Sequence, residues 1–426
     1  MNIERVSMIG LGYIGLPTAA LVASRGLQVI GVDVNEETVA TLNQGLVHIV
    51  EPDLDKLVHQ VVKEGKMVAT TTPETSDVFV IAVPTPFTEG FKPDLSYVRR
   101  ACIAIAPVLE IGNLVILEST SPVGATDQMV KWLADERPDL TFPDASMSLD
   151  EQQNIDVHVS YCPERVLPGK VLTELVANDR VIGGVTPQCA TLSAAFYKRF
   201  VEGECLTTNA RTAELAKLTE NSFRDVNIAF ANELSMICEK FDINVWELIE
   251  LTNRHPRVDV LQPGCGVGGH CIAVDPWFIV DSAPELSNLI RTAREVNDSK
   301  PQWVMAQVEK MLSTFLLNHP TKSLSEVSIA CFGLAFKPNI DDLRESPALQ
   351  IAEMIADKYA SSDVRIVEPN ITVFPATSSL NHENASLVST EQGSVADIKL
   401  ILVAHDAFKA EEKLSTGTSL NVAWAT

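Results

Sequence analysis

The first third of the chain alternates short runs of β-branched and aliphatic residues with segments in which apolar residues recur at helical spacing. Between the runs Val6–Ile9 and Gln28–Val32, for example, Ile14–Arg25 has small and apolar residues every three or four positions. This alternation predicts a parallel sheet whose strands are joined by helices. The strands expected here are Val6–Ile9, Gln28–Val32, Val78–Val83, Leu114–Glu118, His158–Tyr161 and Val181–Gly184, the last of which should close the domain.

The pattern changes after about residue 208. Ala210–Lys240 contains no Gly or Pro, and its apolar positions recur every three to four residues, which predicts one long helix. Because this helix is much longer than the usual ~11–12 residues, it should join two domains or form a subunit interface. Further helices are expected at Val245–Thr252 and Leu286–Leu317, and after a linker at His319–Ser325 the strands Val327–Phe332, Val364–Val367 and Leu400–Val403 predict a second α/β unit.

Composition narrows the classes of function. The 426 residues carry a formal net charge of −23 without any basic run, which argues against nucleic acid and anionic membranes as partners. The apolar runs are strand-sized, and the N-terminus lacks the regions of a signal peptide. The eight cysteines form no CxxC pair, so we expect a protein of the reducing cytoplasm rather than a disulfide framework.

A glycine-rich turn follows the first expected strand. Gly10, Gly12 and Gly15 form GxGxxG between a strand and a helix, where glycines allow a pyrophosphate to approach the helix N-terminus. Asp33 ends the second strand, where a carboxylate binds ribose hydroxyls and repels a 2′-phosphate, so NAD is favoured over NADP. The alternative is a plain tight turn with a surface aspartate.

A second glycine-dense loop, Gly264–Cys271, ends in a thiol, and Asp275 follows four residues later. A thiolate is a strong covalent nucleophile at neutral pH, which makes Cys271 a candidate catalytic group. Two alternatives stay open: a buried cysteine that serves only packing, and a metal site built from Cys265, His270 and Cys271. The spacing of these three differs from that of structural zinc sites, and no metal is predicted.

Polar residues also line one face of the long helix. Glu214, Lys217, Asn221 and Arg224 follow one another at intervals of three or four residues. An ammonium and an amide on one face suit stabilisation of an oxyanion, whereas a solvated helix face is the alternative.

Three more loops stand at predicted strand ends or between prolines. They are Glu118–Gly124 (ESTSPVG), Tyr161–Gly169 (YCPERVLPG) and the segment Gly333–Pro347. The carboxyl ends of strands are where α/β sheets bind ligands, although ordinary loop geometry also accounts for each of them taken singly.

Taken together, these motifs resemble the UDP-glucose/GDP-mannose dehydrogenase family over nearly the whole chain. The ordered set is GxGxxG, ESTSPVG, PERVLPG, ELAKLTEN, GVGGHCIAVDP and GLAFKPNIDDLRESP. The form HCIAVDP, with NRHPR upstream, resembles the branch that oxidises UDP-N-acetyl-D-mannosamine. The resemblance implies an N-terminal Rossmann-type NAD domain (1–206), a central long-helix dimerisation domain (207–318) and a C-terminal Rossmann-like UDP-sugar domain (319–426).

The family reaction implied by this resemblance oxidises the sugar C6 alcohol to a carboxylate in two steps, with NAD as acceptor and a thiohemiacetal and thioester on Cys271. The product would serve a bacterial surface polysaccharide, such as enterobacterial common antigen or a capsule, and the protein would be a cytoplasmic homodimer. The implied catalytic residues are Cys271, Lys217, Asn221, Glu164, Asp275 and Thr120. Those implied for NAD are Gly10, Gly12, Tyr13, Ile14, Gly15, Asp33, Thr85, Thr120 and Arg344. Those implied for the nucleotide sugar are Arg165, Val166, Lys217, Asn221, Arg224, His255, Arg257, Gly268, Phe336 and Lys337.

Other functions are weighed against this one. UDP-N-acetylglucosamine is an alternative substrate. A single-step hydroxy-acid dehydrogenase of the 6-phosphogluconate type shares the leading domain and the Lys-x-x-x-Asn pair but needs no thiol. An NAD-sensing regulator would lack the nucleophile. The C-terminus, Leu420–Thr426, departs from the family pattern of a strand with an Asp followed by a basic residue, which puts the last strand in doubt.

Overall fold

The computed structural model describes residues 3–88, 90–148, 150–167, 169–269, 271–408 and 418–422. The chain divides into two compact units. The first comprises Met1–Glu220 and Trp277–Ala283, and the second comprises Asn221–Pro276 and Pro284–Thr426. The division falls inside two helices, α8 (Ala210–Phe241) and α10 (Asp275–Ser282), so both units share these elements.

The first unit is built on an eight-stranded sheet with the order β3-β2-β1-β4-β5-β6-β7-β8. Neighbouring strands are parallel except for β6 and β7, so most carboxyl ends meet at one edge of the sheet. The strands are β1 (Arg5–Ile9), β2 (Gln28–Val32), β3 (Met67–Thr70), β4 (Val78–Ile81), β5 (Leu114–Leu117), β6 (His158–Tyr161), β7 (Arg180–Gly184) and β8 (Cys205–Asn209).

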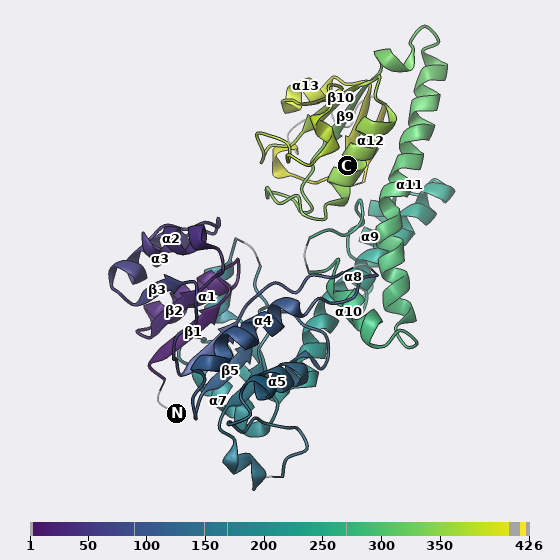
Figure 1. The fold of residues 1–426 in the computed structure, drawn as a ribbon. Coiled ribbons are helices and arrows are strands. Elements are labelled where there is room, and N and C mark those ends of the chain that lie inside the picture. The colour runs from purple at the N-terminus through teal and green to yellow at the C-terminus, as the bar shows by residue number, and fades with distance from the viewer. Residues whose placement is uncertain are drawn as a thin grey trace. The chain divides into compact units, whose positions relative to one another are not determined.

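Helices cover both faces of this sheet (Figure 1). Residues of β4 alternate between two apolar clusters: Val78 and Val80 pack with α1 and α3, while Phe79 and Ile81 pack with α4 and α5. This two-residue period explains why a strand buried on both faces reads as a continuous apolar run. The helices are α1 (Gly15–Ser24), α2 (Glu36–Asn43), α3 (Leu54–Lys63), α4 (Ser96–Ile105), α5 (Ala125–Glu136), α6 (Val171–Ala177) and α7 (Pro187–Tyr197).

The second unit carries a five-stranded parallel sheet with the order β11-β10-β9-β12-β13. Its centre is β9, where Ile329 and Cys331 join one apolar cluster and Ala330 and Phe332 join another on the opposite face. The strands are β9 (Ser328–Phe332), β10 (Asp363–Val367), β11 (Ala385–Leu387), β12 (Ile398–Ile401) and β13 (Thr418–Asn421). The helices are α9 (Val245–Thr252), α11 (Asn288–Asn318), α12 (Pro347–Lys358) and α13 (Thr390–Ser394).

The two sheets share one turn geometry at their first strand. Gly10 follows β1 with φ +95°, and Gly333 follows β9 with φ +89°, a region open mainly to glycine. Each glycine N–H donates to the last carbonyl of the neighbouring strand, at 2.8 Å in both cases. The next N–H, that of Leu11 or Leu334, donates to a carboxylate just beyond that neighbouring strand, Asp33 or Glu368.

The α/β class and the long central helix are confirmed. The prediction that Val181–Gly184 closes the first sheet is wrong, because β8 follows and pairs with β7. Strand β8 consists largely of partly exposed and polar residues, so it lacks an apolar run. Strand β3, which has only four residues, was not predicted either. The proposed domain boundary after residue 206 falls within β8, and the boundaries stay a prediction. The doubtful last strand forms as β13, while residues 423–426 lie outside the described residues.

No helix within the described ranges is long and apolar enough to cross a membrane.

A buried ion pair joins α8 to α11 inside the second unit. The Arg294 Nη1 atom lies 2.6 Å from the Asp225 Oδ1 atom, both side chains are almost fully buried, and Arg294 also pairs with Asp298. Burial raises the pKa of the Asp225 carboxyl, and the Arg294 guanidinium opposes that rise. The Asn297 amide donates to the same Asp225 oxygen at 2.8 Å.

We expect Asp225→Ala to lower the free energy of unfolding by ~3–5 kcal/mol, because it leaves a buried guanidinium without its main counter-ion. Chemical denaturation measures this loss. As a matched control, Glu250→Ala removes the exposed ion pair with Arg254, and the denaturation midpoint should stay unchanged. Equal losses in the two variants would contradict the role of burial.

Candidate functional site

The glycine turn after β1 has the geometry that a dinucleotide requires. A Cβ on Gly10 would lie 2.5 Å from the Ala82 carbonyl oxygen, and one on Gly15 would lie 1.9 Å from the Gly10 carbonyl oxygen. A Cβ on Gly12, in contrast, would meet no protein atom within 4 Å. Two glycines therefore serve the tight turn itself, and Gly12 leaves the space beside the start of α1 open.

Asp33 supports this turn and faces the same edge. Its Oδ2 atom accepts the Leu11 N–H at 3.0 Å, and its Oδ1 atom accepts the Asn35 N–H at 2.9 Å. The residue stays partly exposed, so its carboxylate oxygens keep capacity to accept from a ligand hydroxyl. Tyr13 is half exposed and Ile14 partly exposed in the same turn.

Thr85 and Thr120 come together beyond the ends of β4 and β5. The Thr85 hydroxyl donates to the Thr120 carbonyl at 2.6 Å. The turn that follows is held by Glu214 of α8, which accepts from the N–H groups of Gly124 and Thr126 at 2.6 and 2.8 Å. Glu214 is fully buried and ties α8 to the start of α5.

Glu164 lies in a buried charge cluster rather than in an open site. Its Oε2 atom is 2.5 Å from Arg180 Nη1, and its Oε1 atom accepts the Arg165 N–H at 2.6 Å. Glu118 lies beside them, and burial together with the Glu164 charge raises the pKa of Glu118 to about 8. With both oxygens engaged, Glu164 is better placed to fix its loop than to accept a proton.

Lys217 and Asn221 lie one turn apart on α8, partly exposed, as the helical spacing predicts. The Asn221 amide donates to the Asp275 Oδ2 atom at 2.5 Å, which joins two predicted catalytic residues within the second unit. Arg224, further along α8, is exposed.

The thiol loop lies against the turn after β9. A Cβ on Gly268 would lie 2.8 Å from the Phe336 Cβ atom, and one on Gly269 would lie 2.9 Å from the Phe336 ring. The Gly269 N–H donates to the Arg344 carbonyl at 3.2 Å. These close approaches explain the glycines of the loop and bring predicted residues from distant parts of the sequence together.

A proline in α11 leaves a backbone carbonyl of that helix without its helical partner next to this loop. Pro301 has no N–H, so it cannot donate to the Asn297 carbonyl as a regular helix residue would. A Cβ on Gly266 would lie 2.8 Å from that carbonyl oxygen. The loop backbone therefore passes next to the place where the helical hydrogen bond is missing.

Within this loop the two cysteines differ in environment. Cys265 is buried, its thiol donates to the Leu402 carbonyl at 3.2 Å, and burial raises its pKa to about 12. Cys271 is exposed, and its carbonyl accepts the Asp275 N–H at 2.9 Å, so it lies one turn before α10. A helix N-terminus favours an anionic sulfur. His270 lies outside the described residues, and among the described ones no cluster suits a metal ion.

The other predicted residues lie on the surface or form local pairs. Arg165 lies 2.6 Å from Glu220, and Arg344 lies 2.6 Å from Asp342. His255 and Arg257 are exposed after α9, Val166 is partly exposed beside Arg165, and Lys337 is exposed beside the partly exposed Phe336. The predicted set is thus divided between the two units.

The sequence reasoning missed several residues that hold the site together. They are Arg180, Glu368 and His405. For Glu368 a signal was present, since it follows β10 as Asp33 follows β2. The buried arginine and histidine gave none.

A cavity of about 440 Å³ in the second unit is lined by none of the predicted residues. It contains Lys300, Trp246 and Trp303, and burial lowers the pKa of Lys300 to about 8.

Comparison with known proteins matches the chain to three consecutive family models. The NAD binding domain of the UDP-glucose/GDP-mannose dehydrogenase family covers residues 4–201, its central domain covers 211–299, and its UDP binding domain covers 330–421. The chain belongs to the UDP-glucose/GDP-mannose dehydrogenase family. It is an NAD-dependent dehydrogenase, and the open space at Gly12 and the Asp33 carboxylate fit this cofactor.

Individual relatives are similar over nearly the full length. A UDP-N-acetyl-D-mannosamine dehydrogenase from Salmonella typhi is 59% identical over 414 residues, 96% of each chain. An NDP-N-acetyl-D-galactosaminuronic acid dehydrogenase from Ralstonia nicotianae is 56% identical, covering 96% of this chain and 92% of the relative. The solved UDP-D-ManNAc dehydrogenase from Pyrococcus horikoshii superposes with a TM-score of 0.82 at 39% identity, covering 96% of this chain and 91% of that one.

Two glycine variants separate cofactor binding from folding. Gly12→Ala should leave the unfolding midpoint unchanged but weaken NADH binding about 10-fold, because the added methyl group meets only the bound pyrophosphate. Gly15→Ala should instead lower the unfolding midpoint, since its Cβ collides with the Gly10 carbonyl. Thermal unfolding and NADH fluorescence measure the two effects. Unimpaired NADH binding by Gly12→Ala would argue against this placement of the cofactor.

Proposed function

We propose that the enzyme oxidises the C6 alcohol of UDP-N-acetyl-D-mannosamine to the carboxylate of UDP-N-acetyl-D-mannosaminuronate, in two NAD-dependent steps. The observation that carries the proposal is the exposed Cys271 in a glycine loop that packs on the Phe336 turn of the C-terminal sheet. The relatives named for N-acetylhexosamine nucleotides, including the one at 59% identity, support the substrate class.

The thiol accounts for an oxidation by four electrons at one carbon. Bound NAD accepts one hydride in each of the two oxidations. After the first, the Cys271 sulfur adds to the aldehyde carbon, and the new alkoxide is protonated to give a thiohemiacetal. The second oxidation converts this adduct to a thioester; water then attacks the carbonyl, the C–S bond breaks and the thiolate is restored. The covalent bond keeps C6 in place between the two steps.

The other residues of the implied catalytic set are assigned the remaining roles. Lys217 would accept the hydroxyl proton in the first oxidation, and Lys217 and Asn221 would stabilise the oxyanions. Asp275, which accepts the Asn221 amide at 2.5 Å, would orient that amide and the hydrolytic water. Thr120 would hold a water, while the ion pair with Arg180 suits Glu164 to positioning.

The remaining contacts follow the same family pattern. We propose that Tyr13, Ile14, Thr85, Thr120 and Arg344 join Gly10, Gly12, Gly15 and Asp33 around NAD. We propose that Arg165, Val166, Arg224, His255, Arg257, Gly268, Phe336 and Lys337 contact the nucleotide sugar.

A relative at 56% identity is named for an N-acetylgalactosaminuronic acid rather than for a mannosamine. A sugar panel therefore belongs in the first experiment. With UDP-N-acetylmannosamine, the wild type should form two NADH per sugar consumed, and Cys271→Ala should form none of the carboxylate. NADH absorbance and mass spectrometry of the product give both numbers.

The second cysteine of the loop provides the control. Cys265→Ala should keep the two-NADH stoichiometry, because its buried thiol serves packing. If two NADH form only with UDP-N-acetylglucosamine or the galacto sugar, the substrate assignment is wrong and the two-step mechanism stands. One NADH, independent of Cys271, would contradict the thioester route and favour a single-step hydroxy-acid dehydrogenase.

We also propose that the enzyme is a homodimer in which α8 contributes the interface, with Arg257 reaching the neighbouring subunit's site. Large apolar side chains at Phe223, Phe230 and Ile237 repeat every seven residues on α8 and are 68%, 54% and 43% exposed. Seven-residue spacing keeps them on one face, and such a stripe is typical of a helix–helix interface.

Replacing Phe223 and Phe230 together by Ser should shift the protein from dimer to monomer, because it removes two large apolar anchors from the stripe. Light scattering after size-exclusion chromatography measures the mass. Ile111→Ser, which changes an exposed apolar residue outside the stripe, should leave the dimer intact. A wild type that is monomeric at all concentrations would overturn the proposal.

Seven of the eight cysteines are buried or partly buried thiols, which suits a reducing compartment, and we propose a cytoplasmic enzyme. Its uronate product would feed a bacterial surface polysaccharide such as enterobacterial common antigen or a capsule. Loss of that polymer when the gene is deleted tests this role.

A further inference from the structure

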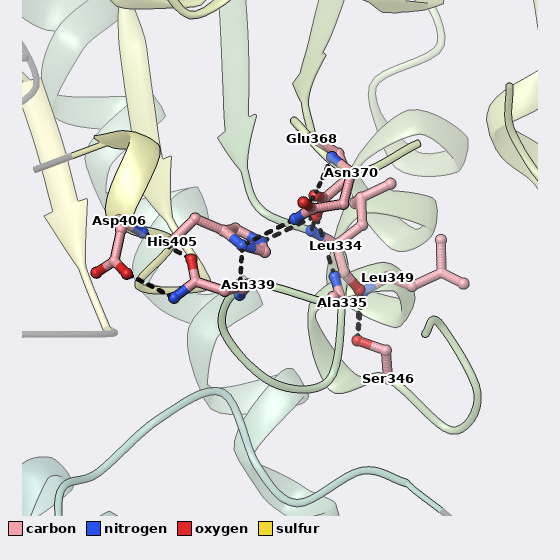
Figure 2. Close-up of polar contacts among 9 residues, drawn as sticks. All are labelled: Leu334, Ala335, Asn339, Ser346, Leu349, Glu368, Asn370, His405 and Asp406. Atoms are coloured by element: carbon pink, nitrogen blue, oxygen red, sulfur yellow. Dashed lines mark hydrogen bonds and ion pairs between the residues drawn. The ribbon is translucent and has the colours of Figure 1, made fainter. Parts of the chain in front are cut away.

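A buried carboxylate and a buried imidazole contact the two ends of the turn 334–339 (Figure 2). Glu368 follows β10 and His405 follows β12; they are 4% and 0% exposed, and the Nε2 and Oε2 atoms lie 3.0 Å apart. The same Oε2 atom accepts the N–H groups of Leu334 and Ala335, at 2.7 and 3.2 Å. The carboxylate thus fixes the first residues of the turn.

The carboxylate remains ionised in spite of its burial. Burial alone would raise the pKa of Glu368, but hydrogen bonds from His405 and from the Leu334 and Asn370 backbone outweigh it and lower the pKa below its usual value. Asn370 supplies both its N–H and its side-chain amide to the Oε1 atom, each at 3.0 Å. Both buried oxygens of the Glu368 carboxylate therefore accept hydrogen bonds.

The hydrogen bonds also define the protonation state of His405. Its Nδ1 atom lies 2.9 Å from the Asn339 backbone N–H, which can only donate, and 3.2 Å from the Asn370 amide nitrogen. Nδ1 is therefore an acceptor, and the single ring proton is on Nε2, where it is donated to Glu368. One neutral imidazole thus links the carboxylate to the far end of the turn.

Asn339, at that far end, has φ +62°, which costs a side-chain-bearing residue conformational energy unless its surroundings hold it. Its side chain donates to Asp406 Oδ2 at 2.7 Å and accepts the Asp406 N–H at 2.9 Å. The turn is therefore held at its start by Glu368 and at its end by His405 and Asp406. Phe336 and Lys337 lie between these two anchors.

The corresponding carboxylate of the first unit, Asp33, is not covered by another side chain in the same way. Asp33 also accepts the N–H after the turn glycine, but it remains partly exposed and faces the ligand edge of its sheet. In the second unit an imidazole covers the equivalent carboxylate. Glu368 is therefore not accessible to a ligand, and its carboxylate bonds to the turn and to His405.

We propose that Glu368 and His405 are positioning residues that hold the turn 334–339 in the conformation that presents Phe336 and Lys337 to the nucleotide diphosphate of the substrate. The inference rests on the proposed function, which assigns Phe336 and Lys337 to the nucleotide sugar. It assigns the pair to substrate affinity rather than to the chemical steps, because both residues are buried behind the turn.

The test compares His405→Leu with His405→Gln in the full-length enzyme. Leucine leaves the Asn339 N–H and the Glu368 carboxylate without their partner, so KM for the nucleotide sugar and the Kd of UDP should rise about 10-fold. Glutamine retains a donor and an acceptor and should recover much of that loss. In both variants kcat should stay within about 2-fold and KM for NAD should not change. Calorimetry with UDP and steady-state kinetics supply these values.

Asn339→Ala provides a second variant on the surface, should the buried leucine prevent folding. It removes both contacts with Asp406 and should raise the same two constants. UDP binding unchanged in His405→Leu or in Asn339→Ala would overturn the positioning role alone. A parallel fall in kcat and in NAD affinity would indicate a general structural defect and overturn it as well. A wild type that binds no UDP would overturn the proposed nucleotide site, and the inference with it.

Discussion

Both sheets of this enzyme depend on the same constraint at the end of their first strand. The chain must leave the strand through a left-handed glycine, and the N–H groups that this turn exposes must find acceptors. The neighbouring strand supplies a carbonyl for the first and a carboxylate for the second, in Asp33 and in Glu368. The ligand edge of each sheet is therefore built around a buried or half-buried anion.

What differs between the two edges is the solvent access of that anion. Asp33 keeps capacity for a ligand hydroxyl, which suits recognition of a ribose. Glu368 is covered by His405, so its oxygens are taken up by the imidazole and by the backbone of its own turn. The same backbone turn thus leaves its carboxylate accessible at one sheet edge and covers it at the other. In the second unit the carboxylate of the turn is therefore buried, whereas the Lys337 side chain of the same turn is exposed.

Periodicity predicted the elements whose burial is complete and failed where burial is partial. Strands β2 and β6 begin and end at the predicted residues and are almost wholly buried, whereas β8 is largely polar, is not buried and carries no apolar pattern. The GxGxxG turn was predictable because it is local in sequence. The Arg180–Glu164 pair and the His405–Glu368 pair join residues from separate strands, and no spacing in the sequence encodes them. The residue pattern left Cys271 open as a nucleophile or a packing residue and Lys217 as an oxyanion site or a solvated face, and only the family resemblance chose between these alternatives.

Burial is also what distinguishes the candidate nucleophile among eight cysteines. Burial raises the pKa of Cys102, Cys162, Cys265 and Cys331 to about 12, so these thiols stay protonated and serve as small apolar groups. Cys271 is exposed, in a loop whose glycines fit against Phe336 and against the Asn297 carbonyl that Pro301 leaves without its helical partner. A reactive thiol must be accessible and yet held in place. Close backbone packing on one side of the loop meets both conditions, because it restrains the chain without covering the sulfur.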